Sequence, residues 1–141
     1  MAAKNDIARM IIFVGLLAFG SALAVAQDEG GPSFPGIKCE ELKQMIDSKA
    51  DSILVVSNDP QESYEEAHIP GAVSFPWVTN LKPPVTLPRN KTLILYCSCA
   101  HEEDSSDMAA KLARFGYRNL KVLTGGFLRW SELKYPLEKS K

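Results

Sequence analysis

The chain has 141 residues, of which 45% are hydrophobic and 23% are charged, a composition typical of one soluble globular domain rather than of a disordered chain. Its 16 lysine and arginine residues nearly balance 17 aspartate and glutamate residues. The resulting net charge of -1 argues against a nucleic-acid-binding protein, which would normally carry a basic excess. Three cysteines are too few for a disulfide-stabilised scaffold, and their odd number leaves at least one unpaired in a monomer.

Residues 1–26 have the features of a signal peptide. Two basic residues precede an apolar run over residues 10–19, and residues 24–26 have the A-x-A form of a signal-peptidase site. This pattern predicts cleavage before Gln27, export to the bacterial periplasm, and no stable membrane insertion of the cleaved protein. Residues 10–26 also reach the lower length limit of a membrane span, so an uncleaved anchor is the alternative.

The first half of the remaining chain predicts a helix and a strand. Residues 27–36 are rich in glycine and proline and predict a flexible lead-in to a domain over residues 37–138. Residues 39–48 carry apolar side chains at helical spacing behind two glutamates, which the helix dipole favours at that end. Residues 52–56 form a short apolar run, which is typical of a buried strand.

The middle of the chain predicts two further strands separated by a loop. Residues 72–75 follow a Pro-Gly turn and predict a short strand. Residues 77–90 contain three prolines and predict a surface loop. Residues 92–96 predict another buried strand, which ends at Cys97.

The last third of the chain continues the alternation. Asp104 or Ser105 can cap a helix that ends at Gly116, and a strand over residues 120–123 and a helix over residues 126–134 follow. Alternating strands and helices with short connections predict an α/β fold, in which helices cover both faces of a parallel sheet.

Cys97 is the candidate nucleophile. In open parallel sheets the ligand crevice lies outside the carboxyl ends of the strands, and Cys97 follows such an end directly before a helix. The amino terminus of a helix favours a thiolate over a thiol.

Three stretches of the chain resemble the rhodanese homology domain. Residues 67–72, A-H-I-P-G-A, resemble the G-H-I-P-G-A turn of the family, and residues 95–97, L-Y-C, resemble the strand that delivers its catalytic cysteine. Residues 116–127 resemble its closing signature. The resemblance implies a rhodanese-like fold with a five-stranded parallel sheet, and we predict no cofactor. It also implies that Cys97 accepts sulfur as a persulfide from a small sulfane-sulfur donor and passes it to a thiol or another nucleophilic acceptor.

The sequence departs from the common family pattern at the active loop. The usual C-x4-R loop would place arginine at position 102, where this chain has Glu102, and a phosphatase C-x5-R loop would require arginine in place of Glu103. Without a fixed cation for a phosphate dianion, a phosphatase is excluded. The D-V-R triplet of the family is replaced by S-N-D at residues 57–59. The loop instead resembles a minority C-x-C-P-x-E-x-T-S pattern, which it matches at Cys97, Cys99, Glu102 and Ser105.

The predicted substrate-binding loop follows Cys97. Its backbone N–H groups and the following helix can stabilise a thiolate, whereas its three carboxylates raise the pKa of a nearby thiol and repel anionic donors such as thiosulfate. We therefore expect weak activity with thiosulfate. Besides Cys99, the loop comprises Ser98, Ala100, His101, Glu102, Glu103, Asp104 and Ser105.

Several alternatives remain open for this loop. Cys99 is either a resolving thiol that forms a disulfide with Cys97 or a small apolar residue packed in the loop. His101 is either a general base or a solvated side chain. We predict no metal site, since ligands packed within six residues seldom surround a tetrahedral ion. The alternatives to a sulfurtransferase are a thiol–disulfide oxidoreductase that uses Cys97 and Cys99, and a non-catalytic binding module.

Overall fold

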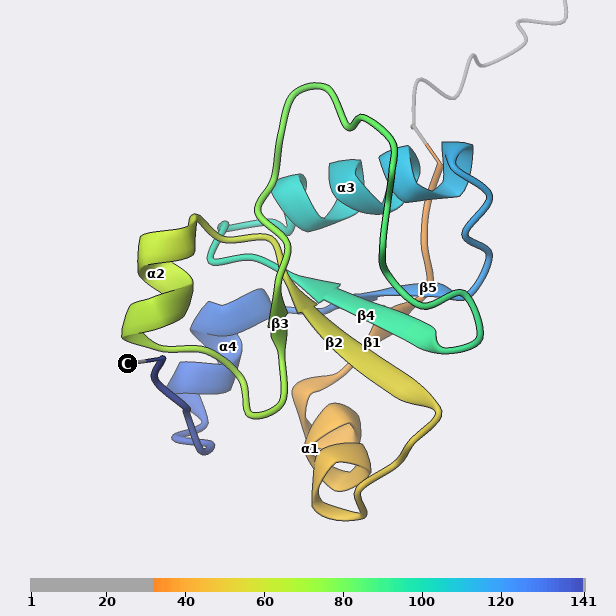
Figure 1. Cartoon of the computed structure of the whole chain (residues 1–141). Helices are drawn as coiled ribbons and strands as arrows, with labels where there is room; N and C mark the ends of the chain where they lie inside the picture. Colours follow the sequence, from red (N-terminus) through yellow and green to blue (C-terminus); the bar gives the residue numbers. More distant parts are fainter. Residues whose placement is uncertain (1–31, 141) are drawn as a thin grey trace, which may run out of the picture.

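A computed structural model describes residues 32–140 of the chain. The predicted signal peptide and residues 27–31 of the lead-in lie outside these residues. The described part contains a five-stranded sheet with the strand order β1-β5-β4-β2-β3, in which every neighbouring pair is parallel (Figure 1). The strands are β1 (Gly36–Ile37), β2 (Ile53–Ser57), β3 (Val73–Ser74), β4 (Thr92–Tyr96) and β5 (Leu120–Leu123).

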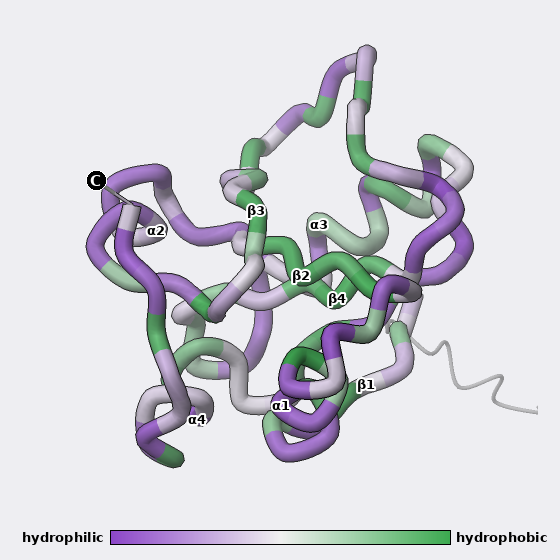
Figure 2. Tube along the Cα trace, turned by 60° about the horizontal axis from the view of Figure 1, so that its bottom comes forward, coloured by the Kyte–Doolittle hydropathy of each residue, from purple (hydrophilic) through white to green (hydrophobic). Residues whose placement is uncertain are grey.

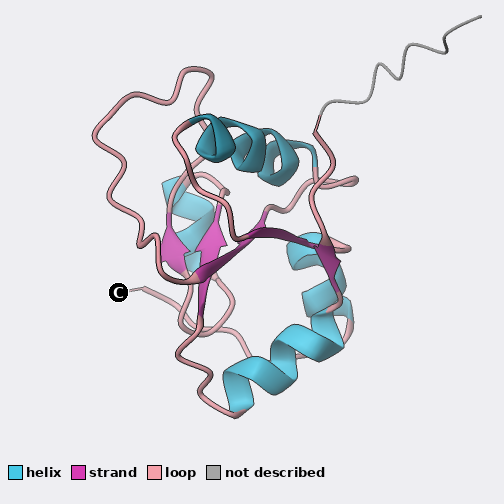
Figure 3. Ribbon diagram, turned by 90° about the vertical axis from the view of Figure 1, so that its right-hand side faces the viewer, coloured by secondary structure: helices cyan, strands magenta, loops and turns pink. Residues whose placement is uncertain are grey.

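Helices lie on both faces of the sheet, as predicted. The helix α3 covers one face, and α1 and α4 cover the other (Figures 1 and 3). Within residues 32–140, none of the helices is long and apolar enough to span a membrane. The helices are α1 (Cys39–Asp47), α2 (Gln61–Glu66), α3 (Glu103–Arg114) and α4 (Gly126–Glu132).

The sheet separates two hydrophobic clusters. Side chains alternate along a strand, so Ile94 and Tyr96 of β4 pack with Trp130 of α4 on one face. Leu95, between them, packs with Met108 of α3 on the other. The strands β2 and β4 are accordingly coloured as hydrophobic along the trace, whereas much of the outer surface of the helices is hydrophilic (Figure 2). Burial on both faces explains why the strands have continuous rather than alternating hydrophobicity.

Two elements were not predicted from the sequence. Gly36, the last residue of the predicted lead-in, belongs to β1 and pairs with Val122 of β5. A two-residue strand is too short to give a pattern. The helix α2 has no repeated apolar face, and tertiary contacts hold its tyrosine: the Tyr64 hydroxyl donates a hydrogen bond to Ala72 O at 2.7 Å, and its ring stacks on His68.

The start of α3 differs from the prediction. The helix begins at Glu103, and its N-cap residue Glu102 has a left-handed backbone with φ of 57°. Ser105 therefore lies inside the first turn, where its hydroxyl donates a hydrogen bond to Glu102 O at 3.1 Å. The predicted cap at Asp104 or Ser105 was wrong. Capping preference points to aspartate and serine, but it does not show that the backbone turns at Glu102, just before the helix begins.

Candidate active site

The sheet presents Cys97 at its carboxyl edge. Cys97 follows β4, which lies between β5 and β2, and its side chain is fully buried. Its carbonyl accepts a hydrogen bond from the Phe127 N–H at 3.0 Å, across the turn that leads into α4. Gly126 in that turn has φ of +53°, and a Cβ at this position would collide with the Cys97 carbonyl. The glycine thus permits the close approach that fixes the backbone of the cysteine.

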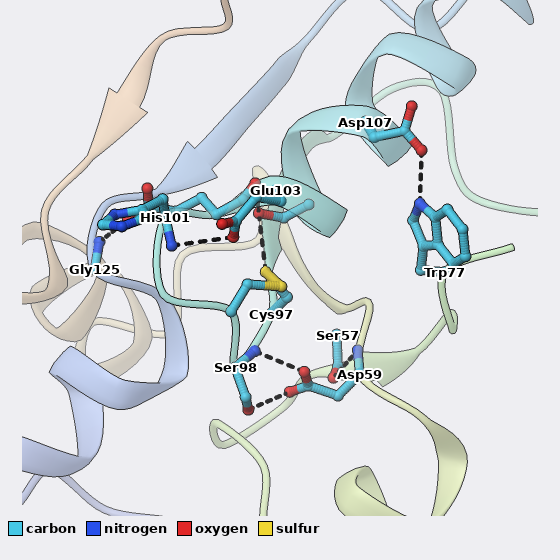
Figure 4. The surroundings of a disulfide bond; sticks show 12 residues. Ser57, Asp59, Trp77, Cys97, Ser98, His101, Glu103, Asp107 and Gly125 are labelled. Carbon is cyan, nitrogen blue, oxygen red and sulfur yellow. Dashed lines mark hydrogen bonds between the residues drawn. A yellow bond between two sulfur atoms is a disulfide. The ribbon is translucent and has the colours of Figure 1, made fainter. Parts of the chain in front are cut away.

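Cys97 and Cys99 are joined in a disulfide, with their Cα atoms 5.3 Å apart (Figure 4). This pairing corresponds to the alternative in which Cys99 forms a disulfide with Cys97, rather than to the one in which Cys99 only packs in the loop. The two residues differ in exposure, since Cys97 is fully buried and Cys99 is half-buried. Cys99 is therefore the more accessible residue of the pair.

The hydroxyl of Ser105, in the first turn of α3, lies beside the sulfur of Cys97. Its Oγ lies 3.6 Å from Cys97 Sγ, and Ser105 is fully buried. In the oxidised protein this hydroxyl donates to Glu102 O. When Cys97 is reduced, the same hydroxyl can turn and donate to the thiolate. A hydrogen bond to the charged form of an acid lowers its pKa, so a hydroxyl in this position is suited to stabilise a thiolate.

Two of the loop carboxylates bind main-chain N–H groups. Glu102 Oε1 accepts a hydrogen bond from Gly125 N, and Glu103 Oε2 accepts one from His101 N at 3.0 Å. Hydrogen bonds from its own N–H and from His101 N–H lower the pKa of Glu103. The sequence predicts that the backbone N–H groups of this loop stabilise a thiolate. The N–H group of His101 is instead occupied by a carboxylate of the protein.

Asp59 is a site residue that sequence reasoning missed. Its carboxylate accepts hydrogen bonds from the Ser98 N–H at 2.6 Å and from the Ser98 hydroxyl at 3.0 Å, so a second loop amide is occupied (Figure 4). Burial raises the pKa of Asp59, the bonds from Ser98 oppose this rise, and the nearby Asp104 carboxylate adds to it. The sequence did contain a signal, because Asp59 follows β2 and Cys97 follows β4. Neighbouring parallel strands bring their carboxyl ends to the same edge.

The remaining loop residues are more open. Ala100 and His101 are exposed, as is Ser98. Among residues 32–140, no group of three or more histidine, cysteine, aspartate and glutamate side chains is arranged to hold a metal ion.

The third cysteine lies apart from the disulfide, in the core. Cys39 is buried, and its thiol donates a weak hydrogen bond to Thr124 O at 3.7 Å. Burial raises the pKa of Cys39 to about 11, with a smaller contribution from the Glu40 carboxylate. The thiol is therefore protonated at neutral pH and unreactive.

Comparison with known proteins agrees with the predicted resemblance. Residues 38–133 match the family model of the rhodanese-like domain. The chain belongs to the rhodanese-like domain family. Its parallel sheet with helices on both faces has the rhodanese-like fold. Cys97 follows β4, as the family resemblance predicts for the cysteine.

Relatives of this rhodanese-like domain include proteins of several kinds. It is 28% identical over 141 residues to the HTH-type transcriptional regulator Rv0324 of Mycobacterium tuberculosis, a match that covers 97% of this chain and 61% of the regulator. It is 30% identical over 104 residues to the adenylyltransferase and sulfurtransferase UBA4 of Lodderomyces elongisporus, covering 68% of this chain and 23% of UBA4. The chain thus spans less than two thirds of these curated relatives. The crystal structure of the BH2092 protein of Bacillus halodurans superimposes with a TM-score of 0.67 at 27% identity, covering 76% of this chain and 78% of that one.

Proposed function

We propose that this rhodanese-like domain transfers sulfur, carrying it as a persulfide on Cys97. The Cys97 thiolate attacks the sulfane sulfur of a small donor, a bond forms between Sγ and that sulfur, and the rest of the donor leaves with the bonding electron pair. A thiol or another nucleophile then takes the outer sulfur and releases the thiolate. The observation that carries the proposal is the placement of a buried cysteine at the carboxyl end of β4, with the Ser105 hydroxyl 3.6 Å from its sulfur. The sulfurtransferase among the relatives supports it.

The persulfide can be detected directly. The protein is reduced, freed of reductant and exposed to a sulfane donor, and its intact mass and peptides are measured. We expect a gain of about 32 Da on Cys97, most clearly in a Cys99→Ser variant. A Cys97→Ser variant should gain nothing, and a Cys39→Ala variant, which also lacks one thiol, should still gain sulfur. Sulfur on Cys39 alone, or on no cysteine, would contradict the proposal.

The disulfide favours a second candidate, a thiol–disulfide oxidoreductase that uses Cys97 and Cys99. Such an enzyme would exchange electrons with dithiol and disulfide substrates when no sulfane donor is present. Turnover of a dithiol and a disulfide without any sulfane donor, lost in both the Cys97→Ser and the Cys99→Ser variants, would favour this candidate over sulfur transfer.

We also propose that the protein works after export to the bacterial periplasm, with its mature chain beginning at Gln27. The A-x-A pattern at residues 24–26 supports this proposal. Amino-terminal sequencing of protein recovered from the cell envelope tests it. A membrane-bound chain that retains residues 1–26 would support the anchor instead.

A further inference from the structure

The Sγ atom of the half-buried Cys99 is bonded directly to Cys97 Sγ, the atom that would carry the persulfide sulfur. The disulfide shows that the two Sγ atoms can meet with the loop in its folded arrangement. Both sides of the loop are held: Ser98, between the two cysteines, is bound by Asp59, and Glu102 is bound to Gly125. A thiol held in this way acts at a high effective concentration.

We propose that Cys99 resolves the persulfide of Cys97 and releases sulfide. This inference rests on the proposed persulfide chemistry. The Cys99 thiolate attacks Cys97 Sγ, a bond forms between the two Sγ atoms, and the bond from Cys97 Sγ to the outer sulfur breaks. The outer sulfur leaves as hydrosulfide, which takes the proton lost by Cys99. The sulfane sulfur is reduced to sulfide and the two cysteines are oxidised to the disulfide, so the step needs no outside oxidant.

The contact geometry selects the inner sulfur as the target. Attack on the outer sulfur would move the persulfide to Cys99 and leave Cys97 as a free thiolate. The structure instead joins Cys99 to Cys97 Sγ itself. Attack there expels the outer sulfur on the side opposite Cys99, as displacement at sulfur requires.

The difference in exposure determines how the disulfide is reset. A reductant in solution reaches the half-buried Cys99 before the fully buried Cys97. The thiolate of the reductant attacks Cys99 Sγ and forms a mixed disulfide with it. Cys97 leaves as a thiolate beside the Ser105 hydroxyl. The second thiol of a dithiol reductant then releases Cys99 and leaves the reductant as a disulfide. The domain thereby becomes a dithiol-dependent enzyme that converts sulfane sulfur to sulfide.

Sulfide release and protein mass test this inference together. Reduced wild-type protein, freed of reductant, is treated with one equivalent of cysteine persulfide, and sulfide and intact mass are followed. The wild type should release about one sulfide per chain and end about 2 Da lighter than the reduced protein. Cys99→Ser and Cys99→Ala variants should hold the additional 32 Da (about one sulfur) and release at least about tenfold less sulfide, while Cys39→Ala behaves as the wild type.

The possible failures have different meanings. If the wild type retains the additional sulfur, or if the Cys99 variants release sulfide as fast as the wild type, the resolving role is overturned and the persulfide proposal stands. If neither the wild type nor the Cys99 variants take up sulfur or release sulfide, the persulfide proposal is itself overturned, and the resolving role falls with it.

Discussion

Asp59 accepts two hydrogen bonds from Ser98, one from the backbone N–H at 2.6 Å and one from the hydroxyl at 3.0 Å. Ser98 is the residue between the two cysteines of the disulfide. A buried carboxylate at the end of β2 thus holds the loop that follows β4. Asp59 is thus separated from each cysteine of the disulfide by a single residue, Ser98.

Replacing Asp59 by asparagine should change how stability depends on pH. Folding raises the pKa of Asp59, so the folded protein binds this proton more tightly than the unfolded chain. The free energy of unfolding of the wild type, relative to Asp59→Asn, should therefore fall as the pH rises from near 3.8, the ordinary pKa of aspartate, through the raised pKa of Asp59. Above the raised pKa, the difference in unfolding free energy between the two proteins should stay constant. Urea unfolding of both proteins over a series of pH values measures it. Parallel pH profiles would show that Asp59 has no such effect.

The state of the three thiols gives a second prediction. Since Cys97 and Cys99 are paired and Cys39 is buried, alkylation of the native, unreduced protein should modify almost none of them. Unfolding without reductant should expose one thiol per chain, Cys39, and reduction should expose all three. Mass spectrometry counts the alkyl groups. Three modified thiols after incubation under oxidising conditions would rule out the pair.

Removing the hydroxyl of Ser105 should raise the pKa of reduced Cys97. A hydrogen bond to a charged group contributes about 1.5–3 kcal/mol, so losing it should shift the pKa by about one unit or more. The rate of alkylation of Cys97 against pH, in a Cys99→Ser background, reports this value. Ser106→Ala is the matched control, because Ser106 is the next residue along the same helix. An equal profile for both variants would mean that the hydroxyl does not reach the thiolate.

Two glycine substitutions separate backbone strain from steric collision. Gly71 and Gly126 both have positive φ, so alanine at either costs about 1 kcal/mol of stability. A Cβ at Gly71 meets nothing within 4 Å, whereas one at Gly126 collides with the Cys97 carbonyl. Gly126→Ala should therefore lose at least about 2 kcal/mol more than Gly71→Ala in urea unfolding. Equal losses would show that the turn has room to move.

The loop carboxylates should set donor preference. Removing the charge of Glu102 by glutamine keeps an acceptor for Gly125 N, yet removes repulsion of the thiosulfate dianion. A screened repulsion of about 1 kcal/mol corresponds to about a fivefold gain in thiosulfate activity. Glu103→Gln should shift activity in the same direction. Cysteine persulfide activity should change less.

A matched control for this charge effect is Asp51→Asn. Asp51 precedes β2 and pairs with Lys91, which precedes β4. Both therefore lie where the strands begin, at the opposite end of the strands from Cys97, so the charge of Asp51 should not affect either donor. If wild-type thiosulfate activity is high and neither glutamine variant changes it, the carboxylates do not face the donor.

Most of the fold could be predicted because burial on both faces makes the central strands continuous apolar runs. The strands β4 and β5 have the predicted bounds, β2 lies one residue later than predicted, and Cys97 directly follows β4 as expected. The strand β1 was not predicted because two residues are too few to show a hydrophobicity pattern. Only its pairing with β5 in the assembled sheet makes it a strand.

The site was harder to predict than the fold. Spacing suggested the pairing of Cys97 with Cys99, but sequence does not show where a carboxylate points. Asp59 is 38 positions before Cys97 and reaches the loop through the register between β2 and β4, which depends on the assembled sheet.

The lengths of the strands have a consequence for solubility. β1 and β3, at the two edges of the sheet, have two residues each, whereas the inner β2 and β4 have five each. An exposed edge strand offers unpaired N–H and C=O groups on which another chain can add a strand, and short edges limit this. The apolar strands most prone to amyloid-like stacking are therefore enclosed between neighbours, and the folded domain offers other copies little edge for intermolecular pairing.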